Sequence, residues 1–370
     1  MTVSASIHGE TCGAARKVAS QPSPYQEAAL PLSLPRRTAL GLAASAALVG
    51  RAQAADRTLK VAYIPILAMS QLFVIVGEGW ATEAGLDLQL TRFSSGPAMV
   101  QALASGGYDV AYIGMGPAMV ARGSGLDLRV LAANGANQGS LIGVGDFATA
   151  FAAAPNPAAA FAAFRQSSGR AVRVATLPKG SVPDTVLRYW LDEVAHVAPA
   201  DVQIQGMGED RVQQALLAGS ADAAGVLEPI LTIVQERVPS AKILALGSEM
   251  FPGQPGAVLA MREATIKAAR PGAETMVRLH VRATKLIVAD PARAADNTLK
   301  VIGTGLISKE TLVRAFQSPA MHPIANPHEV EASTERLGAY QIKLGTLARP
   351  VSNAELFDTS IYDQLPPDAR

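Results

Sequence analysis

Cysteine, aromatic residues and charged residues are all scarce in this sequence. Of its 370 residues one is a cysteine, Cys12, while 5% are aromatic and 17% are charged. Beyond Cys12 the chain therefore has no disulfide, no thiolate metal site and no cysteine nucleophile. Without residues 1–54, which hold five basic and two acidic residues, the chain has 27 basic and 29 acidic groups and a net charge near −2. This balance argues against a nucleic-acid or anionic-membrane partner, since both favour concentrated positive charge.

Motifs of catalysis and metal binding are also missing. The sequence contains neither G-x-S-x-G nor H-E-x-x-H, and its histidines show no metal-ligand spacing. Residues 114–116, "GMG", resemble the start of a dinucleotide-binding loop, but Met119 stands where G-x-G-x-x-G needs its third glycine. We therefore expect no metal, no cofactor and no enzymatic activity.

Long hydrophobic runs are absent too, and the apolar run at 38–49 is well short of the ~20 residues that a bilayer span needs. It follows Arg36 and Arg37, and Ala52-Gln53-Ala54 supplies an A-x-A cleavage site. Residues 1–54 are predicted to be an export signal that resembles the twin-arginine type and that begins with a long polar stretch, residues 1–33. Cleavage near Ala54 would release the mature chain into the periplasm, although the sequence leaves the general secretory route open.

Short apolar segments alternate with segments of helical period along the rest of the chain. "TLKVAYI", "LDLQLTRF" and "DVAYIG" read as strands, and the residues between them predict helices over 70–84 and 97–104. A glycine turn at 114–116 is expected before Pro117 opens the next helix. Repeated strand-helix-strand units predict an α/β fold with a mostly parallel sheet flanked by helices.

An internal repeat indicates that one lobe occurs twice. "RVATLP" at 173–178 matches "KVAYIP" at 60–65, and the segment 212–229 matches the segment 100–117 at nearly the same separation. Helices are expected further on, at 271–289, 291–303, 308–317 and 328–344. The chain is predicted to cross between the lobes near 140–144 and near 257–261, which gives a two-crossing hinge with lobe 1 at 55–143 plus 257–370 and lobe 2 at 144–256.

These segments resemble a known family. "FSSGPAMVQALASGGYDVAYIGMGPAMVARGSGLDLRVLAA", "GVLEPI" and "NAELFDTSIYD" are similar to segments of the periplasmic substrate-binding proteins of ABC importers, in the group that binds nitrate, taurine, sulfonates and thiamine precursors. The resemblance implies a two-lobed periplasmic binding protein fold of type II, which acts as a monomer with an ABC permease and its ATPase. Leu227 departs from the family pattern, because relatives often carry an aromatic residue there.

Three glycine- and serine-rich loops are expected to form the ligand site: "FSSGPAM", "IGMGPAM" and "LPKGSVPDT". Ligands of open α/β sheets lie beyond the carboxyl ends of the strands, and the free N–H groups of the helices that begin there favour anions. The serines have a second interpretation as helix caps. Lys179 is interpreted as a solvated lysine. The candidate ligand-binding residues are Ser70, Ser94, Ser95, Met115, Gly116, Asn137, Gly180, Ser181, Val182 and Glu228.

Glu228 is the one acidic candidate, and two interpretations of it stay open. By the repeat it stands near the position of Gly116, before a helix start. In the first interpretation its carboxylate caps that helix or bonds to the other lobe. A negative charge at a helix N-terminus stabilises the helix by ~0.3–1 kcal/mol. In the second interpretation the carboxylate accepts the amino group of a zwitterionic, taurine-like ligand.

The function expected from these features is capture of a small solute for an importer. The solute is predicted to be a sulfonate-, taurine- or nitrate-like anion or a carboxylate, held between the lobes and delivered to the permease. The alternative is a thiamine-pyrimidine-precursor binding protein, or a synthase-like enzyme of the same fold. The cysteine-rich motif of that enzyme has no counterpart after Cys12. A sensory role is not separated from transport by the sequence.

Overall fold

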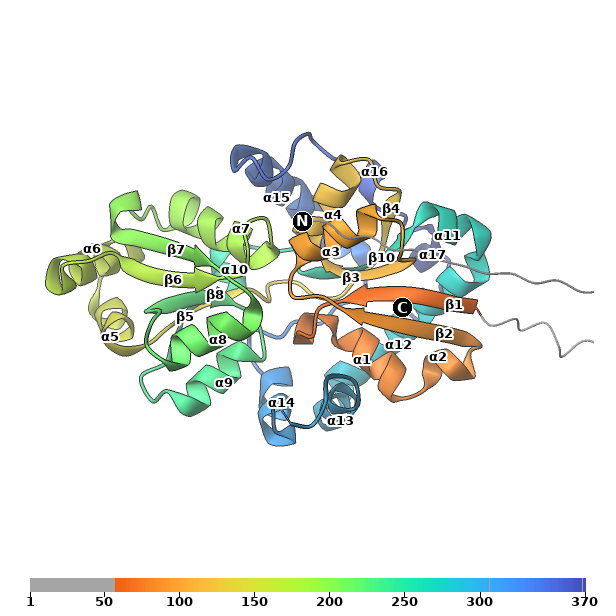
Figure 1. The fold of residues 1–370 in the computed structure, drawn as a ribbon, viewed down its shortest axis with the longest axis horizontal. Coiled ribbons are helices and arrows are strands. Elements are labelled where there is room, and N and C mark those ends of the chain that lie inside the picture. The colour runs from red at the N-terminus through yellow and green to blue at the C-terminus, as the bar shows by residue number, and fades with distance from the viewer. Residues whose placement is uncertain (1–56, 306, 368) are drawn as a thin grey trace, which may run out of the picture. The chain divides into compact units, whose positions relative to one another are not determined.

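Two five-stranded sheets form the core of this computed structural model, which describes residues 57–305, 307–367 and 369–370 (Figure 1). The first sheet has the order β2-β1-β3-β10-β4, and the second has the order β7-β6-β8-β5-β9. The first lobe is built on strands β1 (Arg57–Tyr63), β2 (Leu86–Arg92), β3 (Val110–Gly114), β4 (Leu128–Ala133) and β10 (Ala257–Arg262). The second lobe is built on β5 (Ser140–Gly143), β6 (Val172–Thr176), β7 (Val202–Gly206), β8 (Ala223–Val226) and β9 (Lys242–Ala245).

Each sheet has one antiparallel strand among parallel ones. β10 runs antiparallel to β3 and β4, and β5 runs antiparallel to β8 and β9. In both sheets this strand is the first that the chain forms after crossing from the other lobe. The prediction of mostly parallel sheets flanked by helices is confirmed, and the sequence repeat corresponds to one topology used twice.

The repeat extends to single hydrogen bonds. Asp109 accepts a bond from the backbone N–H of Lys60 at 2.9 Å, and Asp222 accepts one from the backbone N–H of Arg173 at 2.8 Å. Both pairs are related by the same step along the chain, since 173 minus 60 and 222 minus 109 each give 113. The aspartate before β3 and its counterpart before β8 therefore bond to the neighbouring strand in the same way.

The first lobe boundary has to be moved. The sequence places residues up to 143 in lobe 1, whereas Ser140–Gly143 is strand β5 and pairs with β8 and β9 of the second sheet. A short apolar run shows that a strand is present but not which sheet it joins. The first crossing therefore precedes Ser140, and the second lies next to β10.

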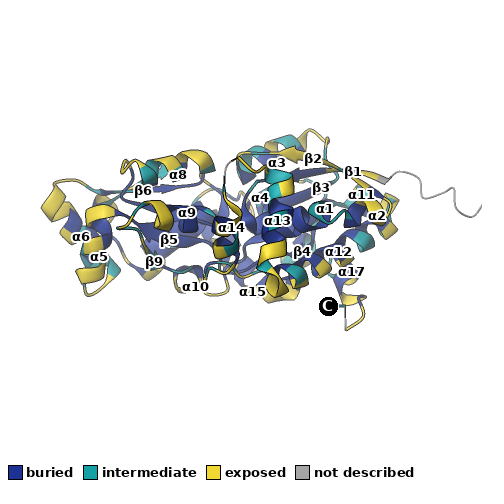
Figure 2. Cartoon of the chain, turned by 90° about the horizontal axis from the view of Figure 1, so that it is seen from below, coloured by how far each residue is buried: buried dark blue, intermediate teal, exposed yellow. Residues whose placement is uncertain are grey.

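Helices cover both faces of the sheets, and their outer faces are exposed while the central strands β3, β10, β5 and β8 are buried (Figure 2). No helix in the described ranges has the length and apolar character that a membrane crossing requires. The helices of the part up to residue 250 are α1 (Ser70–Gly77), α2 (Trp80–Glu83), α3 (Gly96–Ala104), α4 (Met115–Gly123), α5 (Gly145–Ala153), α6 (Pro157–Ser168), α7 (Val182–Tyr189), α8 (Glu209–Leu217), α9 (Ile230–Arg237) and α10 (Gly247–Met250). Those that follow β10 are α11 (Glu263–Ala268), α12 (Arg270–Ala289), α13 (Pro291–Ile302), α14 (Lys309–Phe316), α15 (Glu331–Lys343), α16 (Asn353–Leu356) and α17 (Ser360–Asp363).

Two expected helices differ from the structure. The helix predicted at 70–84 is divided into α1 and α2, because Gly79 between them has a φ of 77°, in the left-handed region. α4 begins at Met115 rather than at Pro117, so Gly114 is its N-cap residue and Gly116 is already helical. Pro117 still lies in the first turn, where a missing N–H leaves no hydrogen bond unmade. The predicted export signal lies outside the described residues.

Candidate functional site

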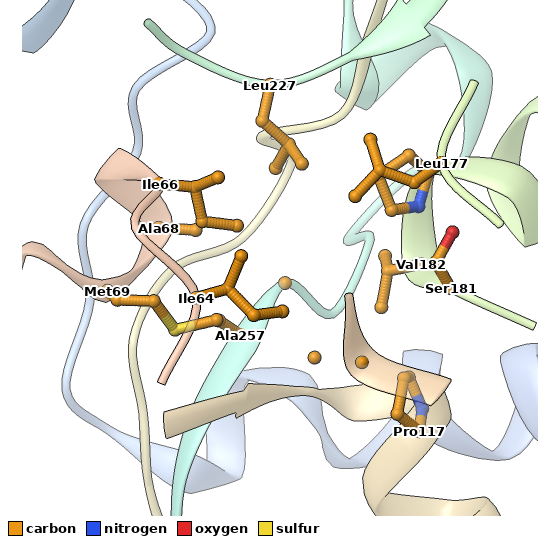
Figure 3. Close-up of a pocket in the computed structure, with 14 residues that line it drawn as sticks. Ile64, Ile66, Ala68, Met69, Pro117, Leu177, Ser181, Val182, Leu227 and Ala257 are labelled. Atoms are coloured by element: carbon orange, nitrogen blue, oxygen red, sulfur yellow. The ribbon is translucent and has the colours of Figure 1, made fainter. Parts of the chain in front are cut away.

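The loops that follow four strands meet at one cavity of about 30 Å³ (Figure 3). Ile64 follows β1, Gly114 ends β3, Leu177 follows β6 and Leu227 follows β8. These are the carboxyl ends of parallel strands from both lobes, where α/β sheets bind ligands. The remaining lining residues are Ile66, Ala68, Met69, Gly96, Pro117, Ser181, Val182, Pro183, Gly256 and Ala257.

Three helices begin at this cavity. Gly96 is the first residue of α3, Val182 is the first residue of α7, and Gly114 is the N-cap residue of α4. The first N–H groups of a helix have no partner within it and carry the positive end of the helix dipole. The loop sequences place glycine and serine at these starts, so the backbone is accessible at close range.

The cavity wall itself is apolar. Ile66, Leu177 and Leu227 face one another across it in Figure 3, and Ser181 is the one residue of this lining that has a hydroxyl group. Of the described residues that line the cavity, none carries a charged side chain. Nor do the described ranges contain a group of three histidine, cysteine, aspartate or glutamate residues able to hold a metal ion. The arrangement therefore favours a small anion, whose negative charge is stabilised by helix N–H groups in surroundings of low polarity.

Five of the predicted site residues lie at or beside the cavity. Ser181 and Val182 line it, and Met115 and Gly116 stand between the lining residues Gly114 and Pro117. Gly180 faces Gly116 across the seam between the lobes, since a Cβ built on Gly116 would lie 3.5 Å from the Gly180 carbonyl oxygen.

The predicted serines at the helix starts act as caps. The Ser181 Oγ accepts from the Asp184 N–H of α7 at 3.3 Å, and the Ser95 Oγ accepts from the Ala98 N–H of α3 at 3.4 Å. Ser95 is buried next to the lining residue Gly96. Capping uses one lone pair of the serine oxygen, and the N–H group of the first helical residue remains available to a ligand.

The four remaining candidates, Glu228 among them, do not line the cavity. Ser94 is exposed and lines a separate, open cavity beside Arg92. Ser70 is buried at the start of α1, one residue after the lining residue Met69. Asn137 lies in the first crossing with a φ of 55°, and its backbone N–H donates to the Gln254 carbonyl oxygen at 2.9 Å.

Glu228 shows the capping arrangement. Its carboxylate is buried and accepts from both the N–H and the hydroxyl of Thr232, at 3.1 and 3.0 Å, in the first turn of α9. Burial raises the pKa of this carboxyl group above its usual range. Its carbonyl oxygen accepts from the Leu67 N–H of the first lobe at 3.3 Å. The residue thus caps its own helix and also ties the two lobes together.

Sequence reasoning missed the apolar lining because it searched for polar groups. A usable signal was present in the repeat, since Ile64 and Leu177 are separated by 113 residues (177 minus 64) and each follows a repeated strand. Gly114 and Leu227 have the same separation (227 minus 114). Positions just after the repeated strands line the cavity in both lobes.

Ion pairs at the rim also connect the two lobes. Arg92 at the end of β2 lies 3.9 Å from the carboxylate of Asp210 in α8. On another side, Lys343 of α15 pairs with Asp192 at 2.7 Å and with Glu193 at 2.6 Å. All five side chains are substantially exposed, so each pair contributes little to stability in water.

Comparisons with known proteins identify the family. The model of the NMT1-like family matches residues 52–303. The chain belongs to this family. It is also 29% identical to a proposed binding protein of Brucella abortus over 281 residues, which is 75% of this chain and 82% of that protein. A relative from Brucella melitensis has the same identity and coverage.

Solved structures show the same fold. The periplasmic nitrate-binding protein of Synechocystis PCC 6803 has a TM-score of 0.69 and 14% identity, over 85% of this chain and 91% of that chain. The alkanesulfonate-binding protein of Xanthomonas axonopodis pv. citri, bound to MOPS, has a TM-score of 0.63 and 18% identity, over 81% and 98%. The predicted two-lobed periplasmic binding protein fold is therefore confirmed.

Proposed function

We propose that this protein is the substrate-binding component of an ABC importer, which closes its two lobes on one small organic or inorganic anion. The observation that supports this most directly is the convergence of the starts of α3, α4 and α7 on one cavity. The family and the fold of nitrate- and sulfonate-binding neighbours support it independently. A sulfonate, a nitrate-like ion and a carboxylate all fit this chemistry.

The lining explains how an anion is held without a cationic side chain. Helix N–H groups are fixed dipoles, so they lose no side-chain entropy when they bind, and they act strongly where the wall is apolar. Lys179, the nearest lysine in the three loops, is exposed, and Gly180 separates it from Ser181. Selectivity between ligands would then come from the shape of the apolar wall and from the number of helix N–H groups from which the ligand can accept hydrogen bonds.

Transport rather than catalysis is the role that these features support. We infer that the chain is exported to the periplasm with cleavage near Ala54, acts as a monomer, and delivers its ligand to an ABC permease and its ATPase. The chain after Cys12 has no cysteine, whereas the synthase-like alternative resembles an enzyme with a cysteine-rich motif. Closure of two lobes about a hinge is the means by which such a protein presents bound ligand.

A thermal-shift screen of residues 55–370 against sulfonates, taurine, nitrate, bicarbonate, carboxylates and pyrimidines tests the proposal. A ligand present at about 100 times its dissociation constant adds about 2.7 kcal/mol of stability. The affinity and stoichiometry of each ligand found in this way are then measured by calorimetry. We expect an anion to bind with one ligand per chain and to be recovered unchanged by mass spectrometry. A chemically altered ligand, or stabilisation by pyrimidines and by no anion, would overturn the proposal.

A further inference from the structure

The side chain of Gln341 is buried at the seam between the lobes. It belongs to α15, which contacts α4 of the first lobe and α7 of the second. The residue has 0% of its surface exposed. Its backbone carbonyl oxygen accepts from the N–H groups of Thr346 and Leu347 at 2.9 and 3.2 Å, which fixes the main chain at this point.

The carboxamide of Gln341 is unpaired. Neither Oε1 nor Nε2 has a hydrogen-bond partner among residues 57–305, 307–367 and 369–370. An unsatisfied buried donor or acceptor costs about 1–3 kcal/mol, and such groups are uncommon in native proteins. Gln254, which is equally buried, differs in this respect: its Oε1 accepts from the Gly139 N–H at 2.7 Å and its Nε2 donates to the Gly139 carbonyl at 3.3 Å.

The unpaired amide lies at the start of α4. A Cβ built on Gly116 would be 2.9 Å from the Gln341 Nε2 and 3.5 Å from the Gly180 carbonyl oxygen, so there is room for the amide only because residue 116 is a glycine. Gly116 is the second residue of the nine-residue helix α4, and Pro117 beside it lines the cavity. A fully buried, unpaired donor and acceptor therefore pack against the start of α4, next to the cavity lining but not part of it.

We propose that Gln341 is a ligand-binding residue that selects anions carrying a hydrogen-bond donor next to the charged group. Its Nε2 donates to an oxygen of the anion at the start of α4, and its Oε1 accepts from a hydroxyl or N–H on the neighbouring ligand atom. The inference rests on the proposed function and narrows its substrate class to hydroxy- or amido-substituted small organic anions.

The preference for anions with a neighbouring hydrogen-bond donor follows from the two polar atoms of the amide. An oxyanion without a donor, such as nitrate, satisfies only Nε2 and leaves Oε1 buried and unpaired. A ligand with a donor beside its anionic group satisfies both atoms. A site built to pair with such a donor rejects analogues that lack it, because its own polar group is then left without a partner.

Calorimetry with two matched pairs of ligands tests the inference. Glycolate is compared with propanoate, and hydroxymethanesulfonate with ethanesulfonate, so that a hydroxyl replaces a methyl group of similar size. We expect the wild-type mature chain to bind the hydroxylated member about tenfold more tightly in at least one pair, and Gln341→Met to lose that preference. An equal preference in the variant and the wild type would overturn the inference.

Stability provides a second readout that needs no ligand. Methionine at 341 removes an unpaired amide and should leave the melting temperature unchanged or raise it, whereas Gln254→Met removes two hydrogen bonds and should lower it. A loss in Gln341→Met as large as in Gln254→Met would assign Gln341 a structural role and overturn the inference.

The binding results also separate this inference from the proposed function. Anion binding without a preference within either pair leaves the importer role in place and overturns only the role of Gln341. If no member of either pair binds, the inference is overturned too. The proposed function is overturned with it only when no anion of the wider screen binds.

Discussion

At the scale of single residues, His280 shows how burial fixes a protonation state. This histidine of α12 is fully buried, its Nε2–H donates to the Ala133 carbonyl at 2.7 Å, and its Nδ1 accepts from the Tyr112 hydroxyl at 3.3 Å. The first bond assigns the proton to Nε2, because a carbonyl only accepts. Burial lowers the pKa of His280 to about 4. Protonation at Nδ1 would place an uncompensated charge inside the first lobe.

The consequence is a loss of stability in mild acid. Because the folded-state pKa lies below the usual value near 6.5, the unfolded chain takes up this proton first as the pH falls. The contribution is fully present above about pH 6.5 and is lost between there and about pH 4, with a difference of about 2 kcal/mol between pH 7 and pH 5. Urea unfolding of the wild type and of His280→Gln at both pH values measures it. Identical pH dependence in the two proteins would contradict the assignment.

At the scale of elements, α7 offers a test of the helix-start site. Its N-cap residue is Ser181, and its first residue, Val182, lines the cavity. The backbone of Ser181 is extended, which is the conformation favoured in a residue that precedes a proline. Proline is accepted at the first position of a helix but has no N–H group. We therefore expect Val182→Pro to keep the fold, with unfolding free energy within about 1 kcal/mol of that of Val182→Ala, and to weaken anion binding about tenfold or more.

The control for this experiment is Val182→Ala, which shortens the same side chain but keeps the N–H group. Calorimetry with the tightest anion of the screen compares the two variants. If they bind equally, the N–H of residue 182 takes no part and the anion must be held elsewhere. A Lys179→Ala variant is expected to bind almost as the wild type does, since the exposed lysine is not among the lining residues.

The sequence predicts the order of the strands and helices along the chain, but not which strands pair with one another in the sheets. Local hydrophobic period and the 113-residue repeat predicted most strands and helices, because both signals are carried by neighbouring residues. The antiparallel strands β5 and β10 each follow a crossing and join the sheet of the lobe that the chain has just entered, and no local pattern encodes that pairing. Gln341 went unnoticed for the same reason, since the fold brings it to Gly116 from a C-terminal helix.

At the scale of the whole molecule, the hinge is a pair of chain crossings that bond to each other. The Gly256 N–H donates to the Gly135 carbonyl at 3.0 Å, the Asn134 N–H donates to the Ala257 carbonyl at 2.8 Å, and Gln254 pairs with Gly139 through its side chain. Two segments joined in this way resist separate movement. The lobes are therefore expected to open as rigid bodies about the crossings, with the exposed rim contacts breaking first.

The rim contact of Arg92 with Asp210 makes this movement measurable. Residues 55–370 contain no cysteine, so in this part of the chain Arg92→Cys with Asp210→Cys places the only two thiols on opposite lobes, at side chains whose charged atoms lie 3.9 Å apart. A short bis-maleimide should link them in the closed form. Anion bound before linking should then survive extensive dilution and gel filtration, because its exit requires the lobes to part, while anion added after linking should fail to enter. Each single-cysteine variant, treated in the same way, should exchange ligand as the wild type does. If linked protein exchanges its anion at the rate of the unlinked protein, the ligand does not lie between the lobes, and the cavity at the starts of α3, α4 and α7 is not its site.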